Sequence, residues 1–238
     1  MFFGLKSAFF RFFASFLALA VLCQAFSRIT VGAYVPALPT EPVSLSPSVT
    51  VVIDAGHGGE DGGASSASGA LEKDLNLAVS FYLCDLLTAN GISTVLTRTE
   101  DVLLYDRSED YIGRKKILDL RARQKIAESY ENCIFVSIHM NAYPLPQYGG
   151  LQVWYSPNDP NSLTLAESVR AAVRHSLQPD NDRTVKRATS SIYLLHNLQC
   201  PAILVECGFL SNPADAALLS TPSYQKQLAT AIFMGIAS

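Results

Sequence analysis

The chain has 238 residues, and 49% of them are hydrophobic, which is ample for a large buried core. Its formal net charge is −3, but the first 33 residues are basic. The rest of the chain holds 15 lysines and arginines against 21 acidic residues, a net charge of −6. This acidic balance argues against nucleic acid as a partner.

Residues 1–33 are typical of an export segment. Two basic residues precede an apolar run at positions 12–26, which only a serine and a glutamine interrupt. This run is short for a membrane span, which needs about 20 residues. We therefore expect a signal peptide or signal anchor, which would be the chain's one membrane contact and would place its function outside the cytoplasm. Residues 34–48 contain four prolines and predict an extended linker.

Residues 49–238 are expected to form a single domain in which strands and helices alternate. Apolar runs predict strands at 49–54, 93–98, 133–138, 150–156, 191–195 and 202–206. Helical spacing predicts helices near 75–89, 114–130 and 163–177, and Asn212-Pro213 and Thr221-Pro222 predict two further helix starts. The pattern indicates a three-layer α/β/α fold around a mostly parallel sheet of roughly six strands.

Two other features are given structural interpretations. The segment 107–125 contains seven basic residues interrupted by acids, and we interpret it as a solvated helix face. Beyond the export segment, four cysteines lie in apolar segments without CxxC spacing. They are Cys84, Cys133, Cys200 and Cys207. We expect small core residues here, not a zinc cluster or a disulfide framework.

Three apolar strands lead to a chemically functional residue. "VVIDAGH" ends at His57, "CIFVSIH" at His139 and "AILVE" at Glu206, and Glu72 stands where a glycine-rich loop meets the first helix. Ligands of such sheets bind beyond the carboxyl ends of the strands, so these four residues are expected to meet there. Singly, each histidine has an ordinary explanation as a core or capping residue, and Glu72 as a first-turn helix acid. A carboxylate at the end of an apolar run is harder to explain unless it is paired or metal-bound.

Two imidazoles and a carboxylate are a suitable ligand set for zinc. They bind Zn²⁺ tetrahedrally and leave a position for a water whose pKa falls to about 7. A second carboxylate can carry that water's proton to a leaving amine. The residues therefore predict zinc-dependent amide hydrolysis, and spacing alone leaves open which glutamate is the ligand and which the base.

Other readings of the glycine-rich loop fail. A P-loop requires Gly-Lys-Ser/Thr, which is absent, and the dinucleotide motif requires glycine where Asp61 stands. HExxH and GxSxG motifs are also missing from the sequence. The glycines are instead expected to let the backbone pass close to a metal.

Five motifs occur in a characteristic order over residues 49–236. They are "IDAGHGGEDGGA", "LEKDLNL", "TRTED", "FVSIHMNA" and "VECGFLSN". In these the chain resembles the zinc-dependent N-acetylmuramoyl-L-alanine amidases of the amidase-3 type. The resemblance implies that residues 49–238 are an amidase domain, in which His57, Glu72 and His139 bind one Zn²⁺ per chain and Glu206 is the catalytic glutamate. The substrate would be peptidoglycan glycan strands with stem peptides, cut between the muramic acid lactyl group and L-alanine.

Three segments resemble the spore-cortex branch of that family. They are "GGLQVWYSPND", "YLLHN" and "VECGFLSNPADAALLS". The resemblance implies removal of stem peptides from cortex so that muramic δ-lactam can form, with the spore intermembrane space as the location. Because the sequence shows no wall-binding repeats, we also expect a protein partner that localises or activates the enzyme.

Five further residues lie in or near the motifs or carry titratable groups. Asn141 and His196 are candidate substrate contacts. Asp54 is expected either to support a metal ligand or to close the loop by a hydrogen bond. Arg98 is expected in a structural ion pair, and His175 at the surface.

Two other functions compete with the amidase. The first is a zinc exopeptidase on free wall peptides, which would need further acidic ligands or a group that clamps a terminal charge. The second is an exported wall-binding module without catalysis. The four chemically active residues argue against the module.

Overall fold

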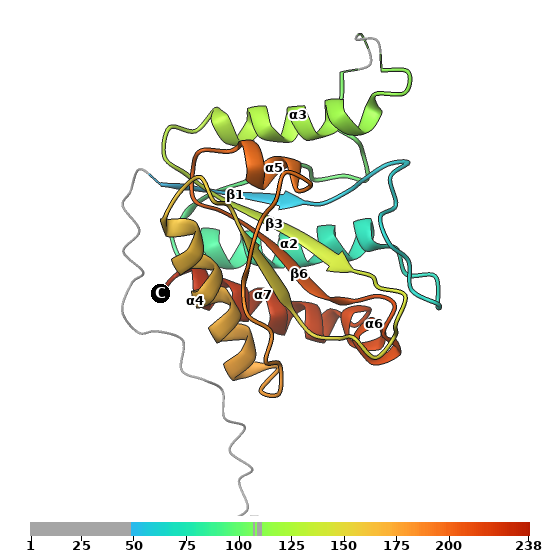
Figure 1. Cartoon of the computed structure of the whole chain (residues 1–238). Coiled ribbons are helices and arrows are strands. Elements are labelled where there is room, and N and C mark those ends of the chain that lie inside the picture. Colours follow the sequence, from blue (N-terminus) through green and yellow to red (C-terminus); the bar gives the residue numbers. More distant parts are fainter. Residues whose placement is uncertain (1–48, 107, 109–110) are drawn as a thin grey trace, which may run out of the picture. The chain divides into compact units, whose positions relative to one another are not determined.

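The structure is a computed structural model that describes residues 49–106, 108 and 111–238, so the expected export segment and linker lie outside it. A six-stranded sheet runs in the order β2-β1-β3-β6-β4-β5 (Figure 1). β1, β2, β3 and β6 are parallel, β4 is antiparallel to β6, and β5 is parallel to β4. The prediction of a mostly parallel sheet is confirmed. The strands are β1 (Thr50–Ala55), β2 (Ser93–Leu96), β3 (Cys133–Asn141), β4 (Gln152–Tyr155), β5 (Lys186–Arg187) and β6 (Ala202–Phe209).

Helices cover both faces of this sheet (Figure 1). On one face α2 and α4 both contact α7, while α6 contacts β6 and α7; on the other, α3 and α5 contact each other. Their bounds are α2 (Glu72–Ala89), α3 (Lys115–Glu128), α4 (Asn161–Ser176), α5 (Tyr193–Asn197), α6 (Pro213–Leu219) and α7 (Pro222–Ile236). Within the described ranges, none of the helices combines the length and apolarity needed to cross a membrane.

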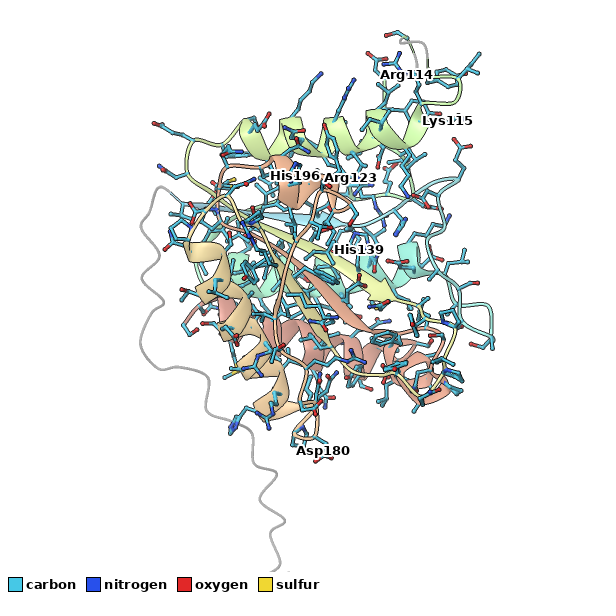
Figure 2. The ribbon with its side chains drawn as sticks, viewed as in Figure 1. Arg114, Lys115, Arg123, His139, Asp180 and His196 are labelled. Carbon is cyan, nitrogen blue, oxygen red and sulfur yellow. The ribbon has the colours of Figure 1, made fainter. Side chains whose placement is uncertain are left out.

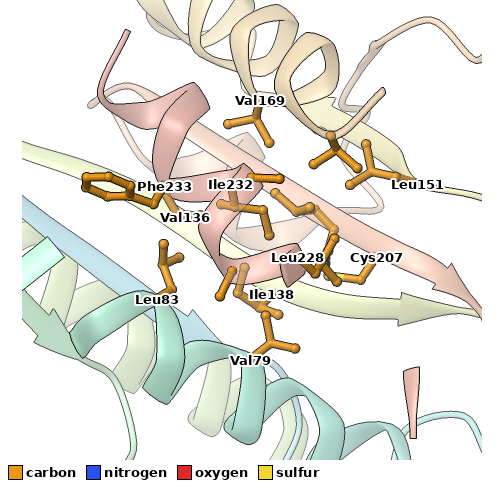
Figure 3. Close-up of a cluster of buried hydrophobic side chains, with 14 of the residues drawn as sticks. Val79, Leu83, Val136, Ile138, Leu151, Val169, Cys207, Leu228, Ile232 and Phe233 are labelled. Carbon is orange, nitrogen blue, oxygen red and sulfur yellow. Dashed lines mark hydrogen bonds between the residues drawn. The ribbon is translucent and has the colours of Figure 1, made fainter. Parts of the chain in front are cut away.

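The strands supply two hydrophobic cores by strict alternation. Val51 and Ile53 of β1 belong to the core under α2, α4 and α7, whereas Val52 between them belongs to the core under α3 and α5. Side chains two apart on a strand point to the same face, which explains this division. Figure 3 shows part of the larger core, where α2, β3 and α7 meet through Val79, Leu83, Val136, Ile138, Leu228 and Ile232.

One predicted strand is wrong. Residues 191–195 were expected to be extended, but α5 begins at Tyr193 and buries Leu194 and Leu195 against the sheet. A short apolar run does not distinguish a strand from a buried helical turn. The remaining strand of the sheet is β5, whose exposed Lys186 and Arg187 carry no apolar pattern.

The two expected helix starts are present with different capping. Asn212 accepts hydrogen bonds from the Ala214 and Asp215 amides, as its position before Pro213 predicts. Thr221 occupies the corresponding position before α7, but its hydroxyl donates to the Leu218 carbonyl.

Candidate metal centre

The parallel strands bring the predicted site residues to one edge of the sheet. His57 follows the end of β1 by two residues, and His139, labelled in Figure 2, lies near the end of β3. The register of β3 and β6 places His139 directly opposite Glu206. Glu72 is the first residue of α2. The expected meeting of these four residues is therefore explained by strand register and by the start of one helix.

His57, Glu72 and His139 form a compact group of potential metal ligands. One ligand atom from each lies within 4.8 Å of the others. His57 Nε2 is 3.2 Å and His139 Nδ1 is 2.9 Å from the same oxygen, Glu72 Oε1. Glu72 is buried, and both histidines are partly exposed. The donor types and their separations suit a Zn²⁺ ion.

Glu72 is held in its ionised form by surrounding donors. Its Oε2 accepts a hydrogen bond of 2.7 Å from the Ala64 amide, and its Oε1 accepts one of 3.1 Å from the Met140 amide. Burial alone would raise the pKa of Glu72, but hydrogen bonds to His139 and His57 and their charges lower it far below its ordinary value. Because a ligand to a metal must be deprotonated, Glu72 is prepared to bind a cation.

Asp61 orients the first histidine. Its Oδ2 lies 2.9 Å from His57 Nδ1. Burial disfavours the charged imidazole, but Glu72 and Asp61 together raise the pKa of His57. A carboxylate behind a histidine is a common support in metal sites, since it fixes the ring and its tautomer. The sequence placed Asp61 in the loop but gave no sign of this role.

Glycines allow the loop to pass close to the three candidate ligands. A Cβ on Gly63 would lie 2.5 Å from Glu72 Oε2 and 2.8 Å from His57 Cδ2. A Cβ on Gly56 would overlap the ring of His139. The loop therefore passes so close to these three side chains that only glycine fits at positions 56 and 63.

We expect Gly63→Ala to weaken zinc binding by about 10- to 100-fold, the range seen when supports of metal ligands are disturbed. The added methyl group would displace the Glu72 carboxylate. Gly69→Ala is a matched control, because Gly69 also has a positive φ but its Cβ would meet nothing within 4 Å. Competition with a chromogenic chelator measures both affinities, and equal zinc affinity in the two variants would contradict this requirement for glycine at position 63.

Two buried arginines hold the backbone that carries His57. Arg98 donates from Nε to the Ala55 carbonyl (2.8 Å) and from Nη2 to that of Gly56 (3.1 Å). Arg123 donates from Nη1 to Ala55 (2.8 Å) and from Nη2 to the His57 carbonyl (2.7 Å). Within the described residues, His57 is the only non-glycine residue with a positive φ, +63°. Few residues other than glycine adopt this conformation, and the arginines fix it.

The contacts of Arg98 and Arg123 contradict two predictions made from the sequence. Arg98 was expected in an ion pair, but its hydrogen bonds go to backbone carbonyls. The segment around Arg123 was expected to be a solvated face, yet Arg123 is only 1% exposed and forms 2.7 Å ion pairs with Asp54 and Asp119. The spacing of Asp119 and Arg123 fits one helix face, but nothing in the sequence indicated that this face is buried.

Asp54 supports the loop without a hydrogen bond to any of the three candidate metal ligands. It accepts hydrogen bonds from Thr97 Oγ1 (2.8 Å), Ser137 Oγ (2.6 Å) and Arg123 Nη1 (2.7 Å). Of the two expected roles, these contacts match the loop-closing hydrogen bond.

Glu206 lines the cleft beside His57 and His139 and has one buried, unpartnered oxygen. Its Oε2 has no hydrogen-bond partner among the residues that the structure describes. Burial, together with the negative charge of Glu72, raises the pKa of Glu206 to about 7, although His139 and His57 oppose the shift. A carboxyl group with such a pKa can both accept and donate a proton near neutral pH.

A cleft of about 410 Å³ opens in front of these groups. Its lining includes His57, His139, Asn141 and Glu206, a cation at Lys116 and apolar side chains from Leu120, Trp154, Ile192 and Tyr193. Asn141, which was expected to contact the substrate, therefore lines this cleft.

His196 is not among the residues that line the cleft. It is exposed on α5 (Figure 2), and its carbonyl accepts a hydrogen bond of 2.8 Å from Asn158 Nδ2. The expected substrate contact is therefore not supported. His175 is exposed on α4, as expected.

Comparison with known proteins agrees with this arrangement. The model of the family Amidase_3, N-acetylmuramoyl-L-alanine amidase, matches residues 51–238. The germination-specific N-acetylmuramoyl-L-alanine amidase of Bacillus subtilis is 37% identical over 82% of this chain and 82% of its own length.

Solved structures give the same result. The CwlD amidase from Clostridioides difficile, solved in complex with the GerS lipoprotein, is 36% identical with a TM-score of 0.74, and the match covers 79% of this chain and 95% of that one. The AmiC2 amidase of Nostoc punctiforme is 34% identical with a TM-score of 0.68 and the same coverage of both chains. Fold, site and similarity agree: the chain belongs to the Amidase_3 family and is an N-acetylmuramoyl-L-alanine amidase.

Proposed function

We propose that His57, Glu72 and His139 bind one Zn²⁺ ion and that Glu206 transfers protons during cleavage of the amide between N-acetylmuramic acid and L-alanine. The observation that carries this proposal is the convergence of two imidazoles and an ionised carboxylate within 4.8 Å. Glu206 lines the cleft beside His57 and His139, and its buried oxygen without a hydrogen-bond partner among the described residues supports its separate role. A bound zinc ion would supply an activated water and polarise the amide carbonyl.

The roles of the protein groups follow from their surroundings. Glu206 accepts a proton from the attacking water and donates one to the alanine nitrogen as the carbon–nitrogen bond breaks. The products are a carboxyl group on the muramic acid lactyl ether and a free amine on the peptide. Asp61 and the two arginines keep His57 in place, and Asn141 with the apolar wall of the cleft contacts the substrate.

The substrate in the cell is proposed to be spore-cortex peptidoglycan. Similarity to a germination-specific amidase over most of both chains supports this assignment. Removal of the stem peptides would expose the lactyl carboxyl groups needed for muramic δ-lactam. A lipoprotein partner is proposed because the similar CwlD amidase was solved with GerS.

The domain organisation is proposed to serve an enzyme that is exported to act on peptidoglycan. Residues 1–33 would direct export as a signal peptide or anchor, and residues 34–48 would link them to the catalytic domain at 49–238. The enzyme would then act outside the cytoplasmic membrane, in the spore intermembrane space.

Amine release from purified peptidoglycan tests the catalytic proposal. We expect new N-terminal L-alanine in the presence of the enzyme, loss of release with a zinc chelator, and recovery when Zn²⁺ is added back. His175→Ala, at an exposed position on α4, serves as an active control. Full release in the chelated, zinc-free enzyme would reject the metal assignment while leaving the amidase activity itself in place.

Muropeptide analysis of spores tests the cortex assignment separately. Spores that lack this gene should contain little or no muramic δ-lactam, and the intact gene should restore it. Unchanged lactam in the deleted strain, together with amine release in vitro, would assign the enzyme to vegetative wall instead.

A further inference from the structure

Two cysteines lie side by side at the end of the sheet opposite the cleft. Cys133 is the first residue of β3, and Cys200 lies two residues before β6 begins. Their sulfur atoms are not bonded in the structure and are 2.7 Å apart. Cys84 and Cys207, the other described cysteines, have no such neighbour within the described residues.

The backbone explains why the two cysteines meet. Phe135 pairs with Ala202 in the parallel register of β3 and β6, and its amide donates to the Pro201 carbonyl at 2.8 Å. Two residues earlier, the same register sets Cys133 opposite Cys200, and both side chains join the core under α3 and α5. Adjacent strands lie about 4.8 Å apart, which is within the range of about 4.4–6.8 Å found between the Cα atoms of disulfides.

We propose that Cys133 and Cys200 form a disulfide bond in the exported enzyme. Peptidoglycan lies outside the cytoplasmic membrane, where disulfides form and persist. The proposal therefore rests on the location at which this family acts and not on the metal or the catalytic glutamate. The sequence predicted four isolated core cysteines, because 67 positions separate this pair.

An oxidant can reach the pair from one side. Both cysteines line a cavity of about 640 Å³ that also contains Glu128, Asp159 and Pro201. Cys200 is partly exposed and Cys133 is buried, so Cys200 is the more accessible of the two sulfurs. The thiolate of one cysteine attacks a protein or small-molecule disulfide and forms a mixed disulfide, which releases the first thiol. The thiolate of the other cysteine then attacks the cysteine sulfur of this mixed disulfide and releases the second thiol, so the pair loses two protons and two electrons and the oxidant is reduced to two thiols.

The bond would tie together the two strands that build the active site. β3 and β6 carry His139 and Glu206 near their carboxyl ends, and the disulfide would join the same strands at their amino ends. It would also close a long loop that contains β4, α4, β5 and α5. Closing a long loop restricts the unfolded chain, so the expected effect is on stability.

Peptide mapping without reduction tests the bond directly. The full chain is expressed with its export segment, collected from the secreted fraction, alkylated and digested with trypsin. Cleavage yields peptide 126–170 with Cys133 and peptide 188–226 with Cys200 and Cys207. We expect these peptides as one species, 2 Da lighter than their sum, that reduction separates. Alkylated Cys133 and Cys200 in most of the secreted protein would overturn the proposal.

Matched variants show which cysteines are joined. Cys207→Ala should retain the cross-linked species and Cys200→Ala should lose it, while Cys84→Ala should have no effect. If the link survives Cys200→Ala and disappears in Cys207→Ala, the pairing is wrong. Because the mapping of the unaltered protein needs no variant, a variant that fails to fold does not remove the test.

Melting temperatures give an independent readout. Reduction of the secreted enzyme should lower its melting temperature by about 5–15 °C, and the double variant Cys133→Ala/Cys200→Ala should melt at the same temperature with and without reductant. Zinc content and amine release at 25 °C should not change on reduction. Equal melting of the oxidised and reduced natural chain would contradict the stabilising role.

Discussion

Glu206→Gln enzyme is expected to keep its zinc and lose about 10²- to 10⁴-fold in turnover, the usual contribution of a positioned acid–base group. Glutamine preserves the shape of the side chain but cannot accept the proton of the attacking water. Zinc retention is expected because Glu206 is not one of the three clustered donors. Zinc analysis and amine release from the same preparation measure both effects.

Glu167→Gln provides the control for this experiment. Glu167 lies on α4 and pairs with Arg170, away from the cleft. Its replacement should leave both zinc content and turnover close to those of the natural chain. Normal turnover in Glu206→Gln would show that another group carries the proton, and loss of zinc would show that Glu206 is a ligand.

Glu206→Gln also has an expected effect on stability, and this effect depends on pH. Burial raises the pKa of Glu206 to about 7, so folding of the metal-free protein takes up a proton between the unfolded pKa, near 4.5, and pH 7. Ionised Glu206 therefore destabilises the fold at pH 8, whereas at pH 4 both states are protonated. Metal-free Glu206→Gln should unfold at higher urea than the natural chain at pH 8 and at similar urea at pH 4. If the natural chain resists more urea than Glu206→Gln at pH 8, burial of the ionised Glu206 carboxylate does not destabilise the fold.

Arg123→Met is expected to destabilise the protein by about 3–5 kcal/mol, the usual result of removing one partner from a buried ion pair. The substitution leaves Asp54 and Asp119 buried without their cation, and the carbonyls of Ala55 and His57 lose donors. Methionine has a similar length, so loss of packing is small by comparison. Urea unfolding at pH 7 measures the change.

Arg121→Met is the matched control, since Arg121 lies on the same helix but is exposed. Its effect should stay within about 0.5 kcal/mol, as for most surface substitutions. If both variants unfold at the same urea concentration, the buried arginine does not support the fold in the way its contacts indicate.

The sequence was sufficient to predict the edge of the sheet at which the site lies. His139 and Glu206 end buried apolar runs, and parallel strands bring such ends together. The α/β alternation was equally clear, because most helices and strands differ in length and period. The short run at 191–195 lacked that difference, and α5 was mistaken for a strand.

Contacts between distant segments could not be predicted from the sequence. Arg123 lies on a helix whose apolar periodicity is weak, so its burial depends on Asp54, 69 positions away. The register of β3 and β6, which brings Cys133 and Cys200 together, is also a property of the folded sheet. The positive φ of His57 occurs where Arg123 donates to the carbonyls of Ala55 and His57, and these contacts leave no mark in the sequence.

The hydrogen bonds from Arg98 and Arg123 to carbonyl oxygens have a consequence for protein engineering. The arginines bind main-chain atoms at positions 55–57, so they hold the backbone of position 57 whichever side chain stands there. Asparagine and aspartate tolerate a positive φ better than most residues. Aspartate at this position would replace a nitrogen donor by an oxygen donor, and oxygen donors suit harder ions such as Mn²⁺. The backbone of this loop is therefore held in place while the side chain at position 57 can be changed to alter the metal preference.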